Sequence, residues 1–111
     1  MVDSPKSSSS NYKEVKLGST NIFTSLPCLI SIDQENYFLV QNQSGRYSLL
    51  SDVCPHMWGT IIIRDDCFLC PDHGWRFDLS KGICINGPRS QMYNIDVINR
   101  NGILFAQFQY Q

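Results

Sequence analysis

The sequence predicts an all-β domain of short antiparallel strands, arranged as a small barrel or sandwich. Short runs rich in β-branched and aromatic residues alternate with clusters of Gly, Asn, Asp and Ser that favour turns. No segment keeps the apolar periodicity of a helix over a helix-length stretch. The chain has 111 residues, which fits one small domain, and it contains no internal repeat.

The expected strands and turns follow one another closely. Tyr93, Ile95 and Val97, for example, alternate with mostly polar neighbours, a period near two that is typical of a half-buried strand. Turn signals lie at residues 33–36, 42–45, 65–66, 80–82 and 99–102. The strands are expected at residues 13–17, 28–32, 37–41, 46–51, 61–64, 67–69, 91–98 and 103–108.

The N-terminal segment differs from the rest in composition. Residues 1–11 are rich in Ser and almost free of large apolar side chains, so they predict a flexible tail. The remaining residues, 12–111, are expected to form the single folded domain.

Charge and hydropathy exclude several classes of protein. Nine Lys and Arg residues against ten Asp and Glu residues give a net charge of −1, so no basic excess indicates nucleic-acid binding. No apolar run approaches the roughly 20 residues of a membrane span. The N-terminus also lacks a basic stretch followed by an apolar core. We therefore expect a cytoplasmic protein without membrane contact.

The most informative residues are two short Cys/His runs. Cys54 and His56 are separated by one residue, and Cys70 and His73 by two. These are the only two histidines of the chain. Its five cysteines are an odd number, so they cannot all be paired in disulfides. A proline follows each of these two cysteines and stiffens its loop. Two thiolates and two imidazoles suit a 2Fe–2S cluster with thiolates on one iron and imidazoles on the other.

Zinc is the alternative for the same donors. Cys54, His56, Cys70 and His73 would also make a tetrahedral set, and Cys67 adds a Cys-x-x-Cys pair with Cys70. Against zinc, the Cys-x-His spacing is closer than the usual spacing of paired zinc ligands. Spacing therefore favours iron–sulfur and leaves zinc open.

The surroundings of the two runs resemble the Rieske family, in particular Rieske-type ferredoxins and the Rieske domains of ring-hydroxylating oxygenases. The resemblance covers about residues 28–108 and rests on Cys54-Pro55-His56-Met57, Gly59-Thr60, the run Leu69-Cys70-Pro71-Asp72-His73-Gly74-Trp75-Arg76-Phe77-Asp78, and Gly82. It implies a Rieske-type fold, in which a small cluster-binding subdomain is inserted into a larger base of antiparallel strands. It also implies Cys54 and Cys70 on the inner iron, and His56 and His73 on the outer iron. The cluster-binding loops would be about residues 52–60 and 69–78, with a covering loop at about 85–89.

The sequence departs from the family pattern at several positions. Trp58 stands where the family usually has Gly, and it is expected either to pack on the loop or to shield the cluster or meet a partner. Cys67 is not at a ligand position and is expected to be a strand residue. The spacer between His56 and Cys70 is also short, which places a trimmed hairpin at residues 65–66.

The resemblance also bears on the reduction potential. High-potential family members carry Ser and Tyr hydroxyls at the positions of Trp75 and Phe77, and a disulfide at the positions of Gly59 and Asp72. Since this chain lacks both features, we expect a potential toward the low end of the Rieske range, on the order of −150 mV.

The expected function is one-electron transfer by a ferredoxin-like protein with a Rieske-type 2Fe–2S cluster. The chain would pass electrons from a flavin-dependent NAD(P)H reductase to a terminal oxygenase or similar acceptor, without catalysing bond chemistry itself. It is expected to be a monomer that docks through Met57, Trp58 and Pro88. The alternatives are a structural zinc-binding interaction module and a non-catalytic Rieske subunit of a larger oxidoreductase; an iron–sulfur sensor has no supporting sequence feature.

Overall fold

The computed structural model describes residues 12–56 and 59–109. The expected tail at residues 1–11, as well as Met57 and Trp58, lies outside the described residues. The elements are β1 (Tyr12–Ser19), the 3-10 turn η1 (Thr20–Ile22), β2 (Cys28–Ile32), β3 (Glu35–Gln41), β4 (Tyr47–Ser51), β5 (Ile62–Arg64), β6 (Cys67–Cys70), β7 (Trp75–Phe77), β8 (Asn94–Arg100) and β9 (Ile103–Gln109).

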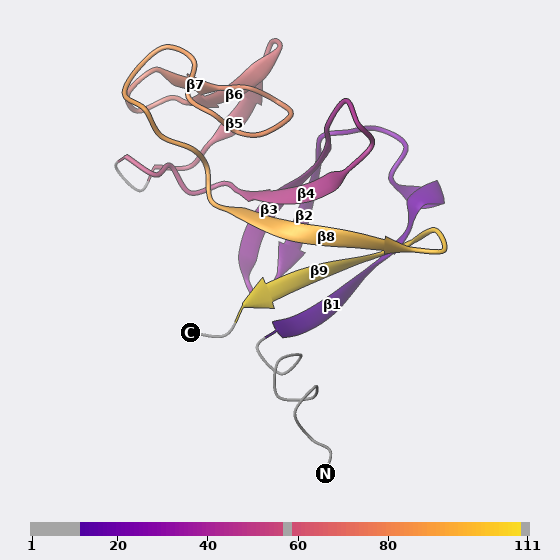
Figure 1. The fold of residues 1–111 in the computed structure, drawn as a ribbon. Coiled ribbons are helices and arrows are strands. Elements are labelled where there is room, and N and C mark those ends of the chain that lie inside the picture. Colours follow the sequence, from indigo (N-terminus) through magenta and orange to yellow (C-terminus); the bar gives the residue numbers. More distant parts are fainter. Residues whose placement is uncertain (1–11, 57–58, 110–111) are drawn as a thin grey trace.

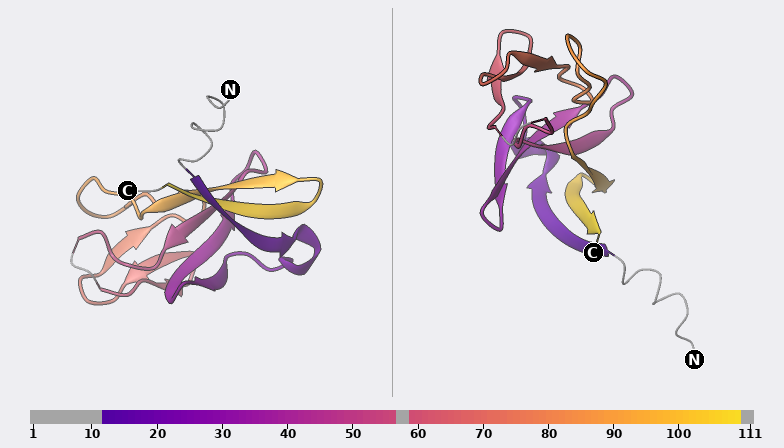
Figure 2. Two further views of the ribbon diagram at one scale, coloured as in Figure 1. Left: turned by 90° about the horizontal axis from the view of Figure 1, so that it is seen from below. Right: turned by 90° about the vertical axis from the view of Figure 1, so that its left-hand side faces the viewer.

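The strands form two antiparallel sheets that differ in size. The larger sheet, the base, has the order β1-β9-β8-β4-β3-β2, and the smaller sheet, the insert, has the order β5-β6-β7. The insert lies between β4 and β8 in the chain and projects from one end of the base (Figures 1 and 2). The predicted all-β architecture, with a small subdomain inserted into a larger base, is confirmed.

Two-residue turns connect several neighbouring strands. Asp33 and Gln34 between β2 and β3 both have positive φ, 51° and 71°, as do Asn101 and Gly102 between β8 and β9, with 54° and 87°. Positive φ at both central residues gives a turn whose twist matches that of the two strands it connects. The pair Asn-Gly is favoured in such turns. Asp65 has a φ of 58° in the tight β5–β6 hairpin, where Arg64 pairs with Cys67. This hairpin was predicted from the two adjacent aspartates.

Some expected boundaries were wrong. The strand expected at residues 91–98 begins at Asn94 and continues to Arg100, because Gln91 forms only an isolated bridge to Ile83. β7 was not expected. Its three residues are too few for a periodic signal, and they become a strand through pairing with β6.

The hairpin of β3 and β4 is buried on both faces and joins the two parts of the fold. Side chains alternate across a strand, so Phe38 and Val40 face one side while Leu39 faces the other. The insert-side core contains Phe38, Val40, Leu50, Cys54, Ile61, Phe68, Cys70, Phe77 and Met92. The base core contains Leu39, Leu49, Val97, Leu104 and Ala106.

The base sheet curls around its own core. Tyr37 on β3 meets Phe108 on β9 edge to face, with ring centroids 5.7 Å apart. Lys13 on β1 forms an ion pair of 3.0 Å with Asp33 after β2, which links the two ends of the strand order. Between residues 12–56 and 59–109, the structure contains no helix of the length and apolarity that a membrane span requires.

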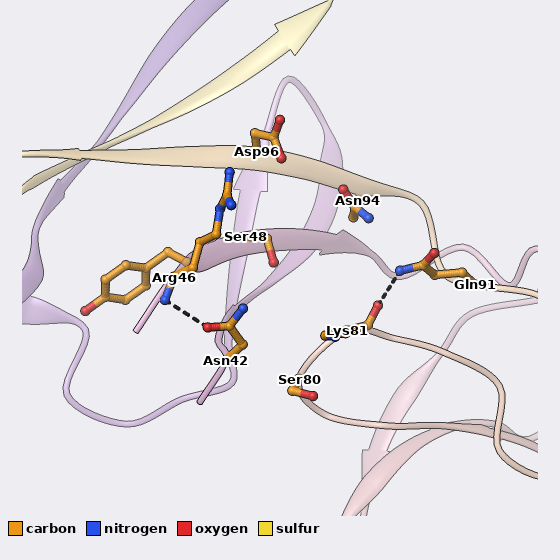
Figure 3. A pocket seen from close by; sticks show the side chains of 9 residues that line it. Asn42, Arg46, Ser48, Ser80, Lys81, Gln91, Asn94 and Asp96 are labelled. Carbon is orange, nitrogen blue, oxygen red and sulfur yellow. Dashed lines mark hydrogen bonds between the residues drawn. The ribbon is translucent and has the colours of Figure 1, made fainter. Parts of the chain in front are cut away.

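A polar pocket of about 190 Å³ lies where the base meets the loop before residue 82 (Figure 3). Gln91 spans this junction and donates from Nε2 to the Lys81 carbonyl at 3.0 Å. The lining contains neither Cys nor His, so the pocket is separate from the predicted ligand loops. It is lined by Asn42, Arg46, Tyr47, Ser48, Ser80, Lys81, Gln91, Asn94 and Asp96.

An ion pair on the base predicts a pH dependence of stability. Arg100 donates to both carboxylate oxygens of Glu14 at 2.7 Å, and Gln107 donates at 2.9 Å. The hydrogen bonds from Arg100, followed by that from Gln107, lower the pKa of Glu14 from 4.5 to about 2. A lowered pKa in the folded state stabilises the fold above the unfolded pKa, and this contribution is lost as the pH falls from about 4.5 toward 2.

We therefore expect Glu14→Gln to lower the melting temperature at pH 7, with a difference from the parent protein that narrows below about pH 4.5. Thermal unfolding from pH 7 to pH 3 measures this, and Glu35→Gln, an exposed carboxylate on β3, is the control. If Glu14→Gln lowered the melting temperature equally at pH 7 and pH 3, the ionised Glu14 carboxylate would not stabilise the fold.

Candidate metal centre

The first predicted ligand loop is a short closed loop between β4 and β5. The Cys54 N–H donates to the Gly59 carbonyl at 2.7 Å, and the Ile61 N–H donates to the Asp52 carbonyl at 2.7 Å. These two bonds hold the stems of the loop together and place Cys54 at its base. Cys54 is fully buried, with an exposed fraction of 0%.

The second ligand loop is a tight turn between β6 and β7. Cys70 is the last residue of β6, and its carbonyl accepts from the N–H groups of His73 at 3.3 Å and Gly74 at 2.8 Å. Gly74 has a φ of 74°, a conformation that residues with a side chain rarely adopt. Cys70 is also fully buried, and Trp75 pairs with it across the turn.

The two loops contact each other at Gly59. A Cβ atom on Gly59 would lie 3.2 Å from the Cys70 Sγ and 2.6 Å from an Asp72 carboxylate oxygen. The absence of a side chain at Gly59 therefore allows the loops to approach. The positions that carry a disulfide in high-potential family members lie side by side here as Gly and Asp.

Each thiol lies close to the imidazole of its own loop. The Cys54 Sγ is 3.6 Å from the His56 Nδ1, and the Cys70 Sγ is 3.9 Å from the His73 Nδ1. Burial, followed by the hydrogen bond with Cys54, raises the pKa of the Cys70 thiol. The two cysteines thus lie in the insert-side core, whereas His73 is exposed and His56 is half-buried.

A third loop, after β7, packs against both ligand loops. The Asn86 side chain accepts from the Arg76 N–H at 2.7 Å and donates to the Gly74 carbonyl at 2.9 Å. Gly87 lies directly on the Trp75 indole, since a Cβ there would overlap the ring. These contacts fix the position of the segment that the sequence predicted as a covering loop.

His56 is enclosed by this arrangement. Its ring lies 5.1 Å from the Trp75 ring and 6.0 Å from the Phe77 ring, measured between centroids. On its outer side, the Nε2 atom lies 2.9 Å from the Ser90 Oγ. Sequence analysis did not identify Ser90 or Asn86 as site residues. The covering loop expected at about residues 85–89 was the only local signal nearby.

Cys67 has different partners from the predicted ligands. Its Sγ donates to the Arg64 carbonyl at 3.5 Å and accepts from the Arg76 guanidinium at 3.1 Å. The Cys67-x-x-Cys70 pair is not a chelating turn, because both cysteines belong to the extended strand β6. Pro88, from the predicted docking patch, is exposed, whereas Met57 and Trp58 lie outside the described residues.

The four predicted donors form two pairs, one thiol and one imidazole on each loop. Within the described ranges, no three His, Cys, Asp or Glu side chains converge as the ligands of one ion would. A 2Fe–2S cluster takes only two protein ligands on each iron. Two buried thiols and two imidazoles on adjacent loops fit the binuclear cluster.

Comparisons with known proteins agree with this fit. The Rieske [2Fe-2S] domain model matches residues 12–101. Cholesterol 7-desaturase nvd 1 of Ciona intestinalis is 41% identical over 61 residues, which are 51% of this chain and 13% of that protein. Cholesterol 7-desaturase of Caenorhabditis elegans is 34% identical over 55 residues, 45% of this chain and 13% of that protein. This chain thus spans only about 13% of the length of these relatives.

Solved structures share the fold. The plasma membrane Rieske protein of Synechocystis PCC 6803 superimposes with a TM-score of 0.66 at 18% identity, over 83% of this chain and 97% of that chain. The quaternary ammonium Rieske monooxygenase CntA gives a TM-score of 0.68 at 15% identity, over 86% of this chain and 31% of that chain.

The family match decides between the two metals that ligand spacing left open, because this family carries iron and sulfide. The chain belongs to the Rieske [2Fe-2S] domain family, and its cofactor is a Rieske-type 2Fe–2S cluster.

Proposed function

We propose that Cys54 and Cys70 bind the inner iron of the cluster and that His56 and His73 bind the outer iron. The observation that carries this assignment is the burial of both thiols between two contacting loops, each with an imidazole at its outer side. The bound cluster supplies one-electron chemistry. The chain is proposed to be an electron-transfer component that catalyses no bond chemistry itself.

The burial pattern supports docking of a redox partner at one end of the molecule. Cys54 and Cys70 lie in the insert-side core and offer no surface. His73 is exposed, as is Pro88 on the third loop. A partner therefore contacts the tip of the insert, at the end of the molecule away from the base (Figure 1).

The electron acceptor must lie outside these 111 residues. A mononuclear oxygenase iron is held by two His and one carboxylate, whereas the chain has only two histidines, and the proposed cluster uses both. The similarity to proteins named cholesterol 7-desaturases supports an oxygenase as the acceptor. The same transfer step would serve a free carrier or a Rieske segment attached to a larger oxygenase.

The proposed donor is a flavin-dependent NAD(P)H reductase. The sequence has no Gly-rich phosphate-binding fingerprint, so the nucleotide is expected to bind to another protein. A low potential suits such a donor. Trp75 and Phe77 pack near His56 but offer no hydroxyl group to the cluster, and the Asp72 carboxylate adds negative charge beside Cys70.

The spectrum and potential of the purified protein test this function. We expect a brown protein whose dithionite-reduced form gives an EPR signal of the low-average-g Rieske type, with a midpoint on the order of −150 mV. A midpoint above about +100 mV would contradict the proposed donor, because the high-potential branch extends to about +300 mV. A colourless protein that binds zinc and resists anaerobic iron–sulfur reconstitution would contradict the assignment altogether.

Single substitutions test the ligands. Cys54→Ser, Cys70→Ser, His56→Ala and His73→Ala are each expected to reduce bound iron from about two atoms per chain to near background. Cys67→Ser is the matched control on the same strand as Cys70, and it is expected to retain iron and the EPR signal. Elemental analysis with EPR measures both. Iron loss in Cys67→Ser equal to that in Cys70→Ser would overturn the ligand assignment.

A further inference from the structure

The two ring nitrogens of His56 face different partners. Nδ1 lies 3.6 Å from the Cys54 Sγ, on the side of the buried thiols. Nε2 lies 2.9 Å from the Ser90 Oγ, although 34 residues separate His56 from Ser90 in the chain. The ring is thus held between a ligand loop and the third loop.

The Ser90 hydroxyl has a second acceptor within reach besides His56. A serine hydroxyl has one hydrogen and two acceptor lone pairs. The Pro88 carbonyl oxygen, 3.4 Å from the Ser90 Oγ, can take that hydrogen. The hydroxyl is then free to accept a hydrogen from the Nε2 of His56, 2.9 Å away. The neutral ring then has its lone pair on Nδ1, since the bond made by one nitrogen sets the role of the other.

Ser90 is itself well anchored. The Cys84 N–H donates to its carbonyl at 3.0 Å, so the loop closes on both sides of Gly87. Gly87 lies on the Trp75 ring, which in turn packs on His56. Movement of Ser90 away from His56 would therefore disturb contacts along the whole loop.

We propose that Ser90 is a positioning residue for the cluster: its hydroxyl accepts the Nε2 hydrogen of His56 and presents Nδ1 as the iron ligand. This inference rests on the proposed ligand role of His56. An acceptor on the far nitrogen fixes the ring orientation and raises the basicity of the ligand. A more basic ligand stabilises the oxidised cluster, so Ser90 lowers the reduction potential. For the exposed His73, the described residues provide no corresponding hydrogen bond.

The test compares variants of the loaded protein by potential and by pulsed EPR of the histidine nitrogens. Ser90→Ala is expected to shift the midpoint potential upward and to alter the nitrogen couplings of one of the two histidines. Ser44→Ala is the control, since Ser44 also makes one side-chain hydrogen bond, to Asn42 at 2.8 Å, but lies in the β3–β4 turn. It is expected to match the parent protein in both measurements.

Ser90→Thr and Ser90→Val form a pair of similar shape that tests the inference even if Ser90→Ala binds the cluster poorly. Threonine keeps the hydroxyl, whereas valine replaces it with a methyl group of similar size. Ser90→Thr is expected to keep the parent potential and couplings, and Ser90→Val is expected to show the upward shift. Loss of the cluster in Ala and Val with retention in Thr would also support the hydroxyl as the required group.

Three outcomes would overturn the inference. An unshifted potential in Ser90→Val, with normal iron content and EPR signal, would remove the role of Ser90 and leave the proposed function intact. Loss of the cluster in Ser90→Thr as well would show that the site requires the size of serine, not its hydroxyl. A parent protein without the Rieske EPR signal would instead overturn the proposed function, and the role of Ser90 with it.

Discussion

The burial of Cys54 and Cys70 in the insert-side core is the constraint on which the rest of the structure depends. Both thiols have an exposed fraction of 0% and share this core with Phe38, Val40 and Leu50 of the base hairpin. The residues proposed to hold iron are therefore also residues that join the insert to the base. In a domain this small the apolar core is limited, so metal binding and folding are expected to be coupled.

The loops around the two buried thiols are closely fitted. Gly59 has no room for a side chain beside Cys70 and Asp72, and Gly87 has none beside Trp75. Hydrogen bonds from loop backbone and from Asn86 replace the regular pairing that a longer insert would have. The positions that carry a disulfide in high-potential family members are occupied by Gly59 and Asp72, which lie side by side.

Local sequence signals predicted the features that depend only on residues adjacent in the chain. Adjacent aspartates at 65–66 and the Asn-Gly pair at 101–102 each favour a tight turn, and both turns are present. The Cys/His runs indicated candidate donors because ligand spacing is itself local, and the fold brings these residues onto two contacting loops. β7 could not be predicted, because three residues become a strand only through pairing with β6. The contact of Ser90 with His56 could not be predicted either, because the two residues are 34 positions apart and meet only when the third loop folds back onto the first ligand loop.

The two histidines are chemically alike in the sequence but differ in their surroundings. His56 is half-buried, with two aromatic rings and a hydroxyl around it, whereas His73 is exposed on a turn that Gly74 makes possible. An enclosed imidazole is influenced mainly by its own chain, and an exposed one by whatever docks against it. On the proposed ligand assignment, Trp75, Phe77 and Ser90 influence the potential from the His56 side of the site, and the Asp72 carboxylate does so from beside Cys70. A partner docked at the tip would act on the His73 side, so it could exchange electrons without displacing the contacts that hold His56.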